Sequence, residues 1–243
     1  MKAELIPIDS QVLGRNVLAL QDLDTRLPFP EFEAGYLREW APGYVYCKVP
    51  LERIEQVHHL ERNGFNLIEC QIRSAVKLRK PFNLDLFGQY AFAPVTREED
   101  LAEVLDIAAS TFVHDRWRAD PFLPPDLAGE RYRRYVRNSF QDPRESVYRL
   151  LDRETGRTLG FKTHRAVSER EVLFLLGGVH PEFKNLGLGL INEYFEFNEL
   201  IARGFLKGVT HISAANYPVF NLEIGGLGFR VLTTFAVLRK VYP

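Results

Sequence analysis

The sequence has few cysteines and no excess of charge of either sign, and both absences narrow the functions open to it. Only two of its 243 residues are cysteine, Cys47 and Cys70, and their spacing fits neither a metal site nor a redox pair. This usage is typical of a reduced, cytoplasmic chain. Lysine and arginine number 31 against 32 aspartates and glutamates, a formal net charge of -1. No global field would therefore hold the protein on nucleic acid or on an anionic membrane.

Long apolar runs are missing as well. The longest strongly apolar stretch, Val172 to Val179, is far shorter than the roughly 20 residues that span a bilayer. Glu4 and Asp9 precede any apolar run, so we expect no signal peptide. The six histidines show no metal-ligand spacing, and we expect no metal. With 46% hydrophobic residues, the chain is predicted to be a soluble, cytoplasmic, globular protein.

The order of predicted elements divides the chain into two parts, residues 1–88 and 89–243. The first part contains a strand, a helix and a strand, at 44–49, 51–62 and 67–72, with Pro50 at the first helical position and Gly64 closing the helix. This pattern predicts a small N-terminal α/β domain. Lys80 to Asn83, which includes Pro81, is the predicted linker.

The second part begins with a short strand at 90–93 and a helix that starts at Thr96, where Glu99 completes a capping box. A loop at 115–125 and a second amphipathic helix around 132–140 follow. Three strands, at 146–152, 158–167 and 171–179, predict an antiparallel meander. The remaining elements are a helix at 190–203, a strand at 208–213, a short helix and a final strand pair within 229–241.

The turn after the third meander strand is the most informative stretch. It runs from Val179 to Gly189 and joins an apolar strand to a helix. Backbone amides at a helix start attract anions, and glycine lets a pyrophosphate approach the main chain closely. The plainer alternative is that these glycines only make a tight turn. The Rossmann and Walker A patterns are absent, which argues against a dinucleotide or a nucleotide-hydrolysing site.

Two motifs make the second part resemble the GNAT superfamily of acyl-coenzyme A dependent N-acyltransferases. The spacing Lys184-x-x-Gly187-x-Gly189, after Val179-x-Pro181-x-Phe183, is similar to the pyrophosphate loop of the family, with lysine in place of glutamine or arginine. Asn216, followed by Gly228-Phe229, is similar to the second signature. The resemblance implies an α/β (α+β) fold in which helices flank a mixed, mostly antiparallel central sheet.

The resemblance also implies acetyl-CoA as cosubstrate and a direct attack of an amine on its thioester. The strand contacts to the thioester would come from the end of the third meander strand, where Gly177-Gly178 indicates a bulge or a close backbone approach. The residues implied to bind the cosubstrate are Gly178, Val179, Lys184, Asn185, Leu186, Gly187, Leu188, Gly189 and Asn216.

The proton donor is where this chain departs from the family. The family commonly has a tyrosine seven residues beyond the asparagine, and here that position is Glu223, or Ile224 if an apparent one-residue insertion lies earlier. Glu223 could also be an ordinary solvated carboxylate. Tyr217 and Tyr194 are alternative acids, or the thiolate could leave unassisted. His164 and Glu171 are the candidates for the base.

The acceptor is predicted from the loop that contains Asp115, Arg116 and Trp117, which combines a carboxylate, a guanidinium and a flat apolar face. The alternative is a helix-end charge pair with Trp117 in the core. Together with the two-part layout, this loop resembles the dTDP-fucosamine acetyltransferase group, which implies a nucleotide-linked 4-amino-deoxysugar. Another amine, or a module that binds acyl-CoA without catalysis, remains an alternative. An exposed strand edge would allow a homodimer.

Overall fold

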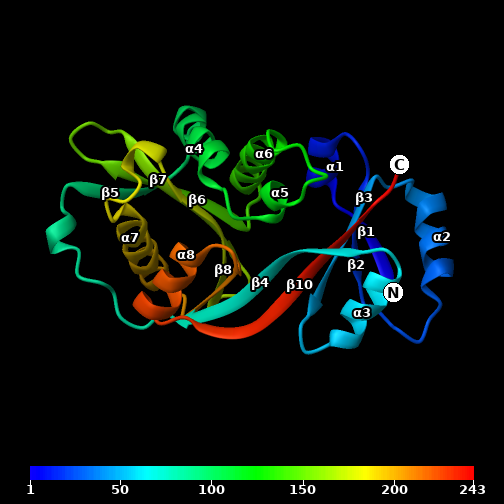
Figure 1. Ribbon diagram of the computed structural model, residues 1–243. Coiled ribbons are helices and arrows are strands. Elements are labelled where there is room, and N and C mark those ends of the chain that lie inside the picture. Colours follow the sequence, from blue (N-terminus) through cyan, green and yellow to red (C-terminus); the bar gives the residue numbers. More distant parts are fainter.

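All ten strands of the protein belong to one sheet. The computed structural model describes residues 1–243, and the strand order is β1-β2-β3-β10-β4-β9-β8-β7-β6-β5 (Figure 1). The strands are β1 (Lys2–Leu5), β2 (Val17–Gln21), β3 (Tyr44–Pro50), β4 (Asn66–Lys77), β5 (Tyr90–Pro94), β6 (Glu145–Asp152), β7 (Thr158–Ala166), β8 (Glu171–Val179), β9 (Lys207–Ser213) and β10 (Arg230–Val241). Six of the nine neighbouring pairs join strands consecutive in sequence, and the other three contain β4 or β10. Only β2·β3 and β8·β9 are parallel.

Helices cover both faces of this sheet. They are α1 (Pro7–Leu13), α2 (Phe29–Trp40), α3 (Ile54–Arg62), α4 (Glu98–Thr111), α5 (Arg116–Ala119), α6 (Leu127–Gln141), α7 (Leu188–Ala202) and α8 (Tyr217–Asn221). Short turns of helix occur at η1 (Asp85–Phe87), η2 (Pro181–Phe183) and η3 (Leu222–Gly226). In Figure 1, α1, α4, α5 and α6 lie above the sheet, whereas α3, α7 and α8 lie below it. No helix is long and apolar enough to cross a membrane.

The two halves of the sheet repeat one topology. In each half a parallel strand pair is joined by a helix, and a second helix then leads to a long strand: β2-α2-β3-α3-β4 in one half and β8-α7-β9-α8-β10 in the other. The long strands are exchanged. β4 pairs with β9, β10 pairs with β3, and the two pair with each other at the centre.

This exchange gives each half a piece of the other's core. Ala236 and Leu238 of β10 are buried in the cluster beneath α2 and α3, and Val76 of β4 is buried in the cluster beneath α7. The predicted boundary near residue 88 therefore crosses a continuous sheet. The predicted linker runs along α7, where Phe82 stacks on Tyr194 with ring centroids 4.0 Å apart.

The meander, the glycine turn and the helix after it are confirmed, but several element limits are wrong. Pro50 ends β3 and the helix begins only at Ile54, because residues 51–53 form a turn. Arg97, not Thr96, precedes the first residue of α4, and no side-chain cap forms there. The predicted final strand pair is the single strand β10. The predicted loop at 115–125 contains the short helix α5, capped by Asp115.

Candidate active site

The parallel strands β8 and β9 pair over only three residues each. The pairs are Glu171 with Lys207, Val172 with Gly208 and Leu173 with Val209. Beyond these pairs β8 continues to Val179 and β9 to Ser213 without a shared ladder, so the backbone between them opens toward their carboxyl ends. A bulge at Leu175 accompanies this change, since Phe174 and Leu176 take successive partners on β7. Backbone groups at the open end are thus free for a ligand.

Glu171 lies at the closed end of this opening. Its carboxylate is 2.9 Å from Nζ of Lys207, and this ion pair joins the first residues of the two strands. The whole length of the paired segment separates Glu171 from the open end. The structure therefore gives Glu171 a strand-joining contact and does not bring it to the place where a base would act.

The glycine turn forms an open helix start beside β8. Asn185 and Gly187 have positive φ angles of 68° and 77°, and α7 begins at Leu188. The turn from Lys184 to Gly187 is exposed, and a Cβ added at Gly187 or at Gly189 would meet no atom within 4 Å. The first amides of a helix have no intrahelical acceptor. Free amides, the positive end of the helix dipole and the Lys184 ammonium make this an anion-binding surface.

The adjacent glycines of β8, Gly177 and Gly178, allow close packing. They do not form a bulge, because the bulge of this strand lies at Leu175. A Cβ on Gly178 would lie 2.8 Å from Cγ2 of Thr111, at the end of α4, and one on Gly177 would lie 2.8 Å from Cδ of Lys162. The Thr111 hydroxyl also donates to the carbonyl of Val179 at 3.3 Å. The close backbone approach is thus confirmed, and it docks α4 onto the end of β8.

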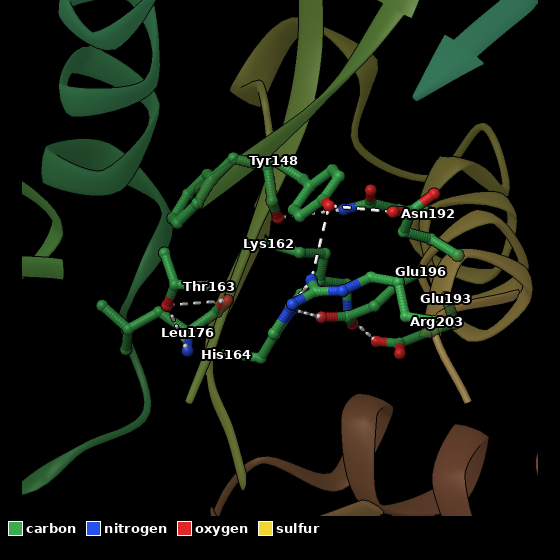
Figure 2. Close-up of polar contacts among 11 residues, drawn as sticks. Tyr148, Lys162, Thr163, His164, Leu176, Asn192, Glu193, Glu196 and Arg203 are labelled. Atoms are coloured by element: carbon green, nitrogen blue, oxygen red, sulfur yellow. Dashed lines mark hydrogen bonds and ion pairs between the residues drawn. The ribbon is translucent and has the colours of Figure 1, made fainter. Parts of the chain in front are cut away.

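A buried polar cluster lies between β7 and α7. Nζ of Lys162 contacts the Glu193 carboxylate and is 3.3 Å from that of Glu196. Nδ1 of His164 is 3.2 Å from Glu196, and its Nε2 is 3.1 Å from Arg203 (Figure 2). His164 is only 1% exposed. With both ring nitrogens engaged and no access to solvent, His164 is placed as a core residue and not as a base.

Glu223 lies at the edge of this cluster, on the π-helical turn η3. The amide of Leu227 donates to the carbonyl of Leu222 at 3.0 Å, a five-residue step that accommodates one extra residue in the turn. The apparent one-residue insertion in the sequence is therefore this turn. The carboxyl group of Glu223 is buried and accepts a hydrogen bond from the Ser74 hydroxyl of β4 at 3.3 Å. Burial, followed by the nearby Glu193 charge, raises the pKa of Glu223 to about 8.

A cleft of about 450 Å³ opens on the other face of the sheet, at the open end of β8 and β9. Three segments line it: the start of β4, the loop from α4 into α5, and the chain that leaves β9. Its polar residues are Glu69, His114, Asp115, Arg118 and Ser213, and Tyr217 stands at its rim with 68% of its surface exposed. Asn216 caps α8 through the amide of Val219. Asp115 and Tyr217 thus lie where the sequence predicts site residues.

Arg116 and Trp117 do not reach this cleft. Arg116 is 2.7 Å from the Asp9 carboxylate and lies over the Tyr46 ring, 4.0 Å from its centroid. Trp117 is 3% exposed in a core cluster with Val12 and Tyr44. Both side chains therefore join the two halves of the protein. The predicted substrate role of Arg116 and Trp117 is therefore wrong, because both side chains are buried against residues of the first half. That half lies far away in the sequence, so the local pattern gave no sign of these contacts.

No protein-family model matches the sequence, and no curated protein does. Solved structures do match. A GCN5-related N-acetyltransferase from Sphaerobacter thermophilus aligns over 98% of this chain and 76% of its own, with a TM-score of 0.66 and 13% identity. A tandem GNAT protein from the clavulanic acid biosynthesis pathway aligns over 93% and 76%, with a TM-score of 0.65 and 13% identity. The chain has the GNAT fold.

A third match is a GCN5-related glucosamine N-acetyltransferase region of a fungal multi-domain GH3 β-N-acetylglucosaminidase. It aligns over 98% of this chain and 31% of that one, with a TM-score of 0.65 and 13% identity. The predicted GNAT fold is therefore confirmed. Two features of the candidate site carry no signal in the sequence: Glu69, whose neighbours form no motif, and the cluster around Lys162, whose members lie on separate elements.

Proposed function

We propose that the protein is an acetyl-CoA dependent N-acetyltransferase in which an amine attacks the thioester directly. The observation that carries this proposal is the position of three features around one opening in the sheet. The glycine turn lies at the end of β8, the buried Glu223 lies on the α7 face, and the cleft lies on the opposite face. A thioester and an amine could thus approach one point from two sides.

The glycine turn suits the pyrophosphate of acetyl-CoA. The amides of Leu188 and Gly189 begin α7 and have no intrahelical acceptor, and no side chain covers Gly187 or Gly189. Lys184 adds a positive charge at the exposed edge. The unpaired end of β8, at Gly178 and Val179, would then lie beside the pantetheine arm, as the resemblance implies.

Glu223 supplies the proton that the leaving group needs. When the amine nitrogen attacks the carbonyl carbon, a C–N bond forms and the C–S bond breaks, so that the sulfur leaves as a thiolate. With a pKa of about 8, Glu223 is protonated at neutral pH and can donate to that sulfur. Lys162 pairs with Glu193 and Glu196, whereas the hydrogen-bond partner of Glu223 is the neutral hydroxyl of Ser74.

For the acceptor, we propose an amino group on a small polar molecule, with a nucleotide-linked 4-amino-deoxysugar as the first class to test. Asp115 supports this choice because it lines the cleft with a negative charge, while one of its oxygens caps α5 and the other accepts a hydrogen bond from the Tyr132 hydroxyl. Arg116 and Trp117 no longer support it, since both are buried elsewhere. The glucosamine N-acetyltransferase region among the structural matches is a reason to include simple amino sugars as well.

A thermal-shift titration with acetyl-CoA, followed by a thiol-release assay, tests the proposal. A ligand at about 100 times its Kd stabilises the folded state by roughly 2.7 kcal/mol, which gives a clear rise in Tm. The acceptor panel contains nucleotide-linked amino-deoxysugars, glucosamine, spermidine and a short peptide with a free N-terminus. Binding with thiol release supports the enzyme, binding without release on any amine favours a non-catalytic module, and absence of binding contradicts the proposal.

A homodimer is part of the same proposal. The strands β1 and β5 form the two edges of the sheet, and each presents unpaired backbone groups on its outer side. Light scattering of the full chain at several concentrations tests this directly, and a monomer mass at every concentration contradicts it.

A further inference from the structure

The first residues of β4 extend beyond the end of β9. Pairing between these strands ends with Gln71 opposite Ser213, after which the Ala214 amide donates to the carbonyl of Cys70 at 2.8 Å. The residues from Leu67 to Cys70 therefore have no strand beside them on that side, and they form one wall of the cleft. A segment from the first third of the chain thus completes the site of the second part.

Glu69 is the buried charged group of this wall. It is 8% exposed and lines the cleft. Nε2 of Gln71 donates to Oε2 at 3.2 Å and the Ser213 hydroxyl also hydrogen bonds to the carboxylate, whereas Oε1 is buried with no hydrogen bond of its own. An unpartnered buried carboxylate oxygen is costly unless a donor reaches it. The cleft is the place from which such a donor, for example an ammonium group, would come.

The charged groups around Glu69 come from two other elements. Lys48 lies on β3, and Asp115 and Arg116 lie at the start of α5. Arg116 is already engaged by Asp9. Burial is the largest influence on Glu69 and raises the pKa of its carboxyl group above the ordinary value. A carboxylate with a raised pKa is a stronger base than an exposed one.

Glu69 and Glu223 lie on opposite faces of the sheet. Glu69 and Ser74 are five residues apart on β4, which has no bulge of its own between them, so their side chains point to opposite faces. Ser74 hydrogen bonds to Glu223 on the α7 face, while Glu69 faces the α5 side with the cleft. The strand β4 thus presents Glu69 on one face and holds Glu223, through Ser74, on the other.

We propose that Glu69 is the general base that takes the proton of the acceptor amine. This inference rests on the proposed function. The acceptor enters the cleft as an ammonium ion, and one N–H proton passes to Oε1 of Glu69, which frees the nitrogen lone pair. The lone pair forms the C–N bond, the C–S electrons leave with sulfur, and sulfur takes the proton of Glu223. Glu69 passes the first proton to solvent before the C–N bond forms, so that it can then take the second proton from the nitrogen, and both carboxyl groups return to their starting states by exchange with solvent.

The test compares Glu69→Gln with the wild-type chain on whichever panel amine the wild type acetylates. At pH 7 we expect kcat/KM to fall by about 10² or more, in the range of general-base contributions, with the Kd for acetyl-CoA unchanged. The ratio of wild-type to variant kcat/KM should shrink as pH rises toward the pKa of the amine, because free amine needs no base. That ratio cancels any pH effect of Glu223, which both proteins share.

Two further variants keep the result interpretable. Glu61→Gln removes an exposed carboxylate of α3 and should leave kcat/KM within twofold of wild type. If Glu69→Gln does not fold, Glu69→Asp retracts the carboxylate and should lower kcat/KM at least tenfold without changing the Kd for acetyl-CoA.

The outcomes separate this inference from the function on which it rests. Full activity of a folded Glu69 variant, or a wild-type to variant ratio that does not change with pH, overturns the role of Glu69 and leaves the acetyltransferase intact. A wild-type chain that neither binds acetyl-CoA nor releases thiol with any amine overturns both.

Discussion

The hydroxyl of Ser74 donates a hydrogen bond to the carboxyl group of Glu223 at 3.3 Å, although 149 residues separate the two. Ser74 belongs to the long strand of the first half and Glu223 to the turn just before the long strand of the second. The exchanged strand therefore holds the proposed proton donor on one face and presents Glu69 on the other. The N-terminal segment contributes directly to the site.

Glu223→Gln should lower kcat with little change in the Kd for acetyl-CoA, because the amide cannot give a proton to the thiolate. Wild-type activity should fall as pH rises above about 8, where Glu223 loses its proton, and the variant should lack that decline. The measurement is a kcat profile from pH 6 to 10. A variant with the wild-type profile would show that sulfur leaves without help from Glu223.

The same substitution has a defined effect on stability. Because the folded-state pKa of Glu223 is raised, the native protein binds more protons than the unfolded chain between the ordinary value of 4.5 and about 8. The free energy of unfolding should therefore fall as pH rises through that interval. Glu223→Gln removes this dependence, and urea unfolding at pH 5 and pH 8 compares the two slopes.

Gly189→Ala should separate stability from ligand binding. The position is helical and a Cβ meets no atom there, so alanine should stabilise the helix by roughly 0.5–1 kcal/mol. The same methyl group lies where we place the pyrophosphate, and we expect the Kd for acetyl-CoA to rise about tenfold, a loss of about 1.4 kcal/mol. Gly35→Ala in α2 is the matched control, since its Cβ is equally free. It should raise Tm and leave the Kd unchanged.

Arg116→Met should destabilise the protein and not alter the recognition of the acceptor. Burial alone would raise the pKa of Asp9. The charges of Arg131 and Arg116 outweigh burial and hold this pKa below its ordinary value. Removing one of the two guanidinium groups should cost roughly 2–4 kcal/mol, because Asp9 stays buried. Urea unfolding measures the loss. The control Arg133→Met removes an exposed pair with Asp106 and should change stability by less than about 0.5 kcal/mol.

The pH dependence of that loss has a definite sign. A carboxylate with a lowered pKa stabilises the fold above its ordinary value of 3.8, and the contribution disappears as pH falls through the folded-state value. The difference between wild type and Arg116→Met should therefore be constant near neutral pH and shrink only in acid. A difference that grows in acid would contradict the role of the ion pair.

The exchange of β4 and β10 predicts that neither part folds alone. Without residues 1–88, β9 and β10 lose the strand that lies between them, and two edges with buried side chains are exposed. A fragment of residues 89–243 should lack cooperative thermal unfolding, and mixing it with residues 1–88 should restore the transition. Circular dichroism during heating measures both, and a cooperative transition of the isolated fragment would contradict the prediction.

The elements predicted well from sequence were those with a local signal. The meander, the helix of residues 188–202 and the glycine turn follow from periodicity, turn residues and a motif, all within a short span of chain. Pro50 was predicted to start a helix because proline suits the first helical position, but it ends β3, three residues beyond the last pair between β3 and β2. The capping box predicted at Thr96 does not form, because the residue before α4 is Arg97, one position later in the sequence.

The site shows the same division. Spacing and residue type single out Lys184 to Gly189, Asp115 and Glu223 as candidates, since each stands near a recognisable turn or helix start. Arg116 and Trp117 have the same local appearance as Asp115, yet they point into the other half, and only the packing against Asp9 and Tyr44 separates them.

The sequence by itself determined the order of the elements and the glycine turn, because these depend on local backbone preferences, and its two motifs carried the resemblance that implied the GNAT fold. Only the tertiary structure decided that β4 and β10 are exchanged, that the pKa of Glu223 is raised by burial, and that Glu69 lines the cleft. Strand pairing and burial arise between segments more than a hundred residues apart. No local pattern records them, because the free energy of such contacts depends on which surfaces meet.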